Sequence, residues 1–219
     1  MTMKMKKVLG ALAIVGAVVA APASANVILT FGQTAQTTPI TGTNNGSGQT
    51  TISGTNVLVT ITQIDALNPT PIFAIMTLNA TSFGPATLVA GNVVQEFSAT
   101  FCITASLGCL GTNYLSGSFS DATFGAAGGA ALTMSAAQPP LTVAFTSDVI
   151  TNLDLARGLS FSFAGVTPGV GITAGSLSSF VSSISGTFSA NVGKVPEPGT
   201  LALLGLAMAG VGFVRRKAN

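Results

Sequence analysis

Strict alternation of apolar and polar residues is the feature of this sequence that most limits its fold. In segment 93–104, Val93, Gln95, Phe97, Ala99, Phe101 and Ile103 alternate with Val94, Glu96, Ser98, Thr100, Cys102 and Thr104. Successive side chains of a β-strand point to opposite faces, so this order sets the Phe and Ile residues on one side. The segment is therefore predicted to be a strand with one buried face.

The same alternation returns along the rest of the chain. It appears in segments 57–61, 141–145, 159–163 and 183–190. Spacers rich in turn-forming residues separate the strands, at 43–48, 68–71, 125–129 and 167–171. Segment 148–157 offers the one plausible helical turn. This rhythm predicts an all-β fold, an antiparallel β-sandwich or jelly-roll-like body, with a barrel or a solenoid as the alternative.

Charge is scarce, and this shapes the surface more than the fold. Charged residues make up 6% of the chain, against about 25% in ordinary soluble domains. Ser, Thr, Asn, Gln and Gly take their place, while 47% hydrophobic residues with thirteen Phe provide a core. The surface is predicted to be neutral and polar. Such a surface excludes nucleic acid as a partner, because phosphate binding needs clustered Lys and Arg.

The first 25 residues have the order of a secretory signal peptide. Lys4, Lys6 and Lys7 precede an apolar run over 8–21, which is followed by Ala23-Ser24-Ala25. The small side chains of Ala23 and Ala25 fit the shallow pockets of a signal peptidase. We expect cleavage after Ala25 and export through the general secretion machinery. The alternative, an uncleaved anchor, is disfavoured by the short apolar run.

The last 25 residues have three parts in a fixed order. These are a proline-rich motif, an apolar stretch over about 199–214 and a basic end: Val195, Pro196, Glu197 and Pro198, then Arg215, Arg216 and Lys217. On length alone the apolar stretch fits either a transmembrane helix or a buried core helix. A core helix would show a polar stripe, and this stretch shows none. We therefore expect a single transmembrane helix, with the basic residues in the cytoplasm and the body, residues 26–194, outside.

With these residues in view, the tail resembles a PEP-CTERM sorting domain, the signal read by the membrane-embedded exosortase of Gram-negative bacteria. The Pro196-Glu197-Pro198 motif, the apolar span and the terminal arginines carry the resemblance. The prolines fix φ and remove amide donors, which keeps the motif extended and accessible to an enzyme. The structural alternative is a stiff linker before an ordinary anchor.

The resemblance implies how the protein is processed and where it is located. Exosortase is the implied partner, and the inner membrane holds the chain in transit. The processed body is then expected at the cell surface or outside the cell, in association with exopolysaccharide or biofilm.

The two cysteines are close in sequence and flank a predicted turn. Cys102 and Cys109 could face each other across a hairpin whose turn is 106–108. Export favours oxidation, and a loop this small would add about 2.5 kcal/mol by the chain-entropy estimate. The alternative, a reactive thiol pair, lacks both a CxxC spacing and a neighbouring cation. We expect a disulfide that fixes one hairpin.

Catalytic and metal-binding chemistry is thinly supplied. The chain has no His, which removes the usual general base and zinc ligand. Five carboxylates remain in the body before residue 194: Asp65, Glu96, Asp121, Asp148 and Asp154. Asp148, Asn152 and Asp154 offer oxygen ligands, but without the glycine turn and bidentate Glu of a calcium loop. A solvated turn with an Asp154–Arg157 pair is the favoured interpretation.

The sequence thus predicts no catalytic residue, no metal site and no cofactor. Without Trp and with a single Tyr, it also lacks the aromatic platforms that stack on sugar rings. We expect a non-enzymatic surface or matrix protein. The alternatives are a ligand- or Ca²⁺-binding surface domain and a His-free hydrolase.

Overall fold

The computed structural model describes residues 25–34, 38–65, 71–126, 131–138, 140–151 and 153–191, and for 121–126 and 155 it describes the backbone alone. Within these ranges the chain forms strands, turns and loops, without a helix. The strands are β1 Asn26–Gln33, β2 Ile40–Asn44, β3 Thr50–Ile64, β4 Ile72–Ser82, β5 Thr87–Val89, β6 Asn92–Ser106, β7 Leu110–Ala126, β8 Ala131–Gln138, β9 Thr142–Thr146, β10 Asp154–Thr167, β11 Ile172–Thr173, β12 Ser176–Leu177 and β13 Phe180–Asn191. The predicted all-β class is confirmed, with antiparallel pairing throughout these strands.

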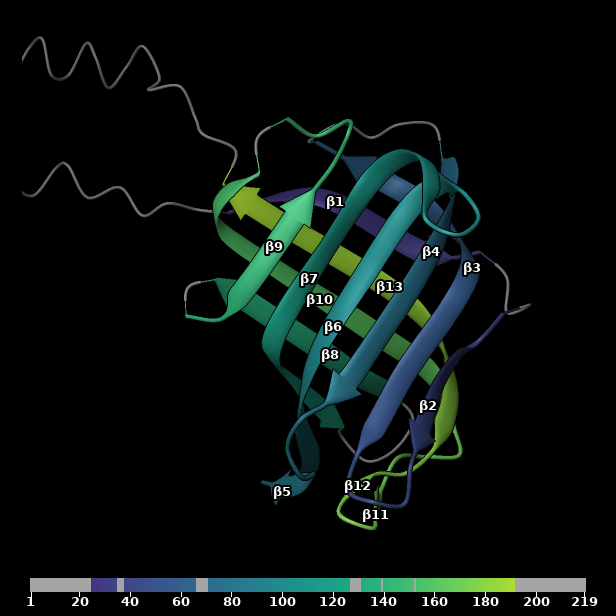
Figure 1. Cartoon of the computed structure of the whole chain (residues 1–219), viewed down its shortest axis with the longest axis vertical. Coiled ribbons are helices and arrows are strands. Elements are labelled where there is room, and N and C mark those ends of the chain that lie inside the picture. The colour runs from purple at the N-terminus through teal and green to yellow at the C-terminus, as the bar shows by residue number, and fades with distance from the viewer. Residues whose placement is uncertain are drawn as a thin grey trace, which may run out of the picture. The chain divides into compact units, whose positions relative to one another are not determined.

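The main sheet closes on itself. Its order is β5-β6-β4-β3-β1-β13-β10-β8-β7-β9, and an additional pairing joins β6 to β7. Figure 1 shows two layers, with β3, β4, β6, β7 and β9 in front and β1, β13, β10 and β8 crossing behind them. Two short strands extend the sheet where longer strands end. β2 pairs with both β3 and β13 beyond the end of β1, and β9 pairs with β7 beyond β8.

Neighbours in the closed sheet follow the order of the chain. Along the ring the strands run β1, β3, β4, β6, β7, β8, β10 and β13, and β13 returns to β1. This is an up-and-down meander, so the Greek-key crossovers that the predicted jelly roll would need are absent from the described strands. Short connections between sequential strands favour such neighbour pairing. The strands are arranged in two layers, as in the predicted sandwich, but the sheet is closed, as in the barrel given as the alternative.

The core lies between the two layers and is rich in phenylalanine. Phe101 of β6 stacks on Phe188 of β13 with ring centroids 5.0 Å apart, and Phe161 of β10 meets both rings edge-on at 5.7 and 5.5 Å. Such aromatic pairs add about 0.5–1.5 kcal/mol each beyond the burial of their area. Gly186 makes room for them, because a Cβ there would lie 2.4 Å from Phe31 Cε1. A small residue between the phenylalanines therefore allows their rings to pack closely in the core.

One end of the sandwich is covered by the β11–β12 hairpin, which a buried polar network holds in place. Gln95, 1% exposed, donates from Nε2 to Gly84 O at 2.8 Å and to Ser176 Oγ at 2.9 Å, and its Oε1 accepts from Leu177 N at 3.2 Å. The hydroxyls of Thr50 and Ser176 also bond to each other. The network contains no charge, so the hairpin is fixed without the desolvation cost of an ion.

One sequence prediction was wrong: segment 148–157 is not a helical turn. Residues 148–151 form a loop, and β10 begins at Asp154. Strand pairing with Asn191 of β13 and Gln138 of β8 holds this segment extended. The register is irregular between Asp154 and Gly158, and Arg157 donates to the main-chain carbonyls of Leu153 and Val143 in place of the predicted pair with Asp154.

Among the described residues, no helix is long and apolar enough to cross a membrane. The expected signal peptide, except for its last residue Ala25, lies outside them, and so does the expected transmembrane helix at about 199–214.

Candidate functional site

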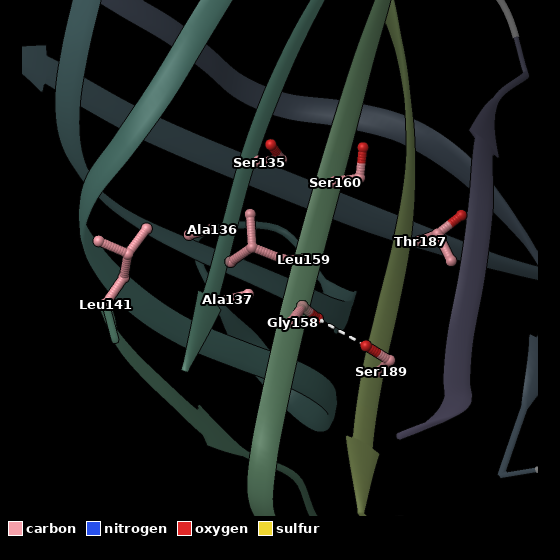
Figure 2. Close-up of a pocket in the computed structure, with 9 residues that line it drawn as sticks. All are labelled: Ser135, Ala136, Ala137, Leu141, Gly158, Leu159, Ser160, Thr187 and Ser189. Carbon is pink, nitrogen blue, oxygen red and sulfur yellow. Dashed lines mark hydrogen bonds between the residues drawn. The ribbon is translucent and has the colours of Figure 1, made fainter. Parts of the chain in front are cut away.

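A shallow hollow of about 450 Å³ lies on the outer face of β8, β10 and β13. Figure 2 shows its lining, in which small side chains and hydroxyls surround Gly158. The residues are Ser135, Ala136, Ala137, Leu141, Gly158, Leu159, Ser160, Thr187 and Ser189. The hollow exists because Gly158 has no side chain between its register partners Ala137 and Ser189. A Cβ at Gly158 would lie 2.9 Å from Ser189 Oγ.

Hydroxyl side chains continue from this hollow across the outer face. Strand register aligns them in two rows: Ser135, Ser160, Thr187 and Thr30 in one, and Thr133, Ser162 and Ser185 in the next. Adjacent strands lie about 4.8 Å apart, so hydroxyls within a row recur at about that interval. Hydroxyls donate and accept hydrogen bonds but neither titrate near neutral pH nor bind metals strongly. This face can hydrogen-bond a neutral partner.

The second candidate is the β6–β7 hairpin with its disulfide. Cys102 and Cys109 are bonded, with Cα atoms 5.8 Å apart. Gly108 and Cys109 both take positive φ, 70° and 59°, which turns the chain sharply. Gly108 N donates to Asn56 Oδ1 of β3 at 3.0 Å, so the turn is also tied to a strand distant in sequence. A smaller hollow of about 150 Å³ lies beside the disulfide, between Thr77, Asn79 and Thr100.

The third candidate is segment 148–157, whose acidic residues suggested a calcium site. Its charged side chains Asp148 and Arg157 make hydrogen bonds to the main chain. Asp148 Oδ2 accepts from Asn113 N at 2.8 Å, which joins the loop after β9 to the start of β7. Arg157 donates from Nε to Leu153 O at 2.7 Å and from Nη1 to Val143 O at 3.3 Å. No ion pair between Asp154 and Arg157 occurs in the described part of the chain. Asn152 lies outside it.

The carboxylates considered from the sequence belong to different elements. Asp65 follows β3, Glu96 is exposed on β6 and Asp121 is part of β7. In the described residues no three His, Cys, Asp or Glu side chains are grouped to hold a metal ion. Neither hollow is lined by a carboxylate.

The residues predicted to direct sorting fall largely outside the described part of the chain. These are Ala23, the motif Val195, Pro196, Glu197 and Pro198, and the basic residues Arg215, Arg216 and Lys217. Ala25 is the first described residue and is exposed, directly before β1. Sequence reasoning missed the hollow at Gly158 and the Gln95 network. A Gly within an alternating strand was the available signal for the first, and Gln95 on an otherwise apolar face for the second.

Comparison with known proteins concerns the tail. Residues 194–217 match the family described as the PEP-CTERM protein-sorting motif. No curated protein and no solved structure matches the chain. The motif marks the chain as an exported protein that transits the membrane and is sorted by exosortase. The match covers the tail, so the activity of the body has to be argued from its own surface.

Proposed function

We propose that this exosortase substrate is a non-enzymatic protein of the cell surface or extracellular matrix, associated with exopolysaccharide or biofilm. A signal peptidase removes residues 1–25, the segment after residue 194 holds the chain in the inner membrane, and exosortase acts at the 195–198 motif. The observation that carries the proposal is the sorting motif at residues 194–217, which follows a β-sheet body.

The surface of the body supports a structural role. Ser160 and Thr187 belong to rows of hydroxyls that are free of charged side chains. Such a face repels neither a neutral polymer nor another copy of the protein, because little net charge opposes their approach. A protein of this kind adds volume and hydrogen-bonding surface to a matrix without changing its chemistry.

The separation of the carboxylates supports the non-enzymatic part of the proposal. Catalysis without His would need two acids, or an acid and a cation, gathered in a cleft. Arg157 instead donates to two main-chain carbonyls, and Asp148 accepts from a main-chain amide. These contacts support the proposal over its alternatives, a Ca²⁺-binding domain and a His-free hydrolase, because they engage two of the residues that motivated those alternatives.

A clean deletion of the gene tests the proposal. The expected result is weaker cell aggregation, altered surface texture and poorer retention of matrix, restored by the complete gene. A complementing gene in which Pro196 and Pro198 are both Ala provides the control, since its body is unchanged while its sorting is impaired. Normal aggregation, texture and matrix retention in the deletion strain would overturn the matrix role.

A further inference from the structure

Three large apolar side chains are exposed at the end of the sandwich that carries the disulfide. Phe73 is 65% exposed, Leu107 60% and Leu110 66%. We call these three residues the tip patch. Leu110 pairs with Ser106 across the β6–β7 hairpin. Phe73 is on the outer face at the start of β4, two positions before Ile75, which pairs with Thr104 of β6.

The turn that carries Leu107 is fixed at two points. The Cys102–Cys109 disulfide closes the turn that contains Leu107, and Gly108 N donates to Asn56 Oδ1. With the turn fixed in this way, Leu107 and Leu110 remain exposed. Apolar side chains kept in water on a fixed turn indicate a surface that is covered in use.

The strand pairings place the C-terminal end of β13, after which the chain continues to the sorting tail, at the same end of the sheet. Asn26 of β1 pairs with Ala190 of β13, and Leu29 pairs with Ile64 at the end of β3. Antiparallel pairing along β4 and β6 sets the start of β4 and the tip of the β6–β7 hairpin at that end as well. By these pairings the start of β4, the β6–β7 turn and the last residues of β13 belong to the same end of the sheet.

The tether between the body and the apolar tail is short. From Asn191 to Leu201 there are ten steps along the chain, which span at most about 35 Å when fully extended. If the tail is in the bilayer, this end of the body stays near the lipid surface. At such a range even a weak contact is populated, because the tether raises the effective concentration of the surface.

We propose that the tip patch docks on the lipid surface of the membrane that holds the tail, and so orients the body before exosortase acts. This inference rests on the proposed function, since it requires the tail to be anchored. The patch contains no Lys or Arg, so docking depends on apolar insertion into the interface and does not require anionic lipid. The opposite end, where β5 exposes Leu88, then points away from the membrane.

Tryptophan reporters in the full chain test the proposal, since the natural sequence has no Trp. The chain is reconstituted in phosphatidylcholine liposomes with or without brominated phosphatidylcholine, a quencher within the bilayer. L110W is the reporter, and F73W is a second one in case the first disturbs the turn. L88W is the matched control, because Leu88 is 68% exposed at the opposite end.

The expected result is that L110W and F73W emit at shorter wavelength and lose intensity with brominated lipid, while L88W does neither. Equal, water-like emission from all three variants in chains that float with the liposomes overturns the docking alone. Chains that fail to float with liposomes overturn both the anchored tail and the docking. A blue shift that depends on protein concentration and is insensitive to brominated lipid indicates a second copy on the patch, which also overturns the proposal.

Discussion

Gln95 Nε2 donates a hydrogen bond to Ser176 Oγ at 2.9 Å across 81 residues of sequence, and both side chains are buried. Gln95 belongs to β6, in the front layer, and Ser176 to the hairpin that covers one end of the core. This contact, with the Gln95 bonds to Gly84 and Leu177, joins the cover to the sheet.

Replacement of Gln95 by Leu is expected to lower the free energy of unfolding by about 2–4 kcal/mol, because buried groups on Gly84, Ser176 and Leu177 lose their partner. Urea unfolding of the exported protein measures the change. Gln49→Leu is the control. Gln49 is exposed and donates to Ser82 O at the edge of the network, so its replacement should change the free energy of unfolding little. Equal effects of the two substitutions would contradict the network as described.

Replacement of Gly186 by Ala is expected to cost about 1–3 kcal/mol, because the core is already filled at that point. The added methyl would lie 2.4 Å from a ring carbon of Phe31 and 3.2 Å from one of Phe161. Gly32→Ala in neighbouring β1 is the matched control, since a Cβ there meets nothing within 4 Å. Thermal melts of both variants give the comparison, and a stable Gly186→Ala protein would mean that the layers are less closely packed.

Replacement of both Cys102 and Cys109 by Ser is expected to lower stability by about 2.5 kcal/mol while leaving the sheet folded. The loop is small, and Gly108 keeps its bond to Asn56. Urea curves with and without reductant check this: the natural protein should respond to reductant and the double variant should not. Complete unfolding of the double variant would show that the disulfide holds more than one hairpin.

Calcium is expected to leave the melting temperature unchanged. Asp148 is engaged with Asn113 N, and Asp154 is in the first pair of β10 with β13. Differential scanning calorimetry with Ca²⁺, with Mg²⁺ and with a chelator provides the measurement. A rise in Tm that is specific to Ca²⁺ would revive a cation site in the 148–157 region.

The sequence predicted the strands in which apolar and small polar residues alternate cleanly. Phe97, Phe101 and Phe188 are buried as their period of two requires. In β4 the alternation does not reveal the strand, because Phe73 and Ile75 on the outer face are as apolar as Ala74 and Met76 on the inner face. The period therefore vanishes there.

Other features depend on contacts that no local pattern contains. The closure of the sheet joins β1 to β13, more than 150 residues apart. The helical turn expected at 148–157 was wrong, because pairing with β8 and β13 outweighs local preference. The candidate surfaces were hidden for the same reason: Ser135, Ser160 and Thr187 become one row only after the strands pair. Resemblance identified the sorting tail, and the family match confirms it.

Mass spectrometry of the protein isolated from cells tests whether two terminal signals deliver this β-body out of the cytoplasm. The expected polypeptide begins at Asn26, ends near the 195–198 motif and is lighter by the two hydrogens of a Cys102–Cys109 disulfide. A cytoplasmic polypeptide that runs intact from Met1 to Asn219 with reduced cysteines would contradict it.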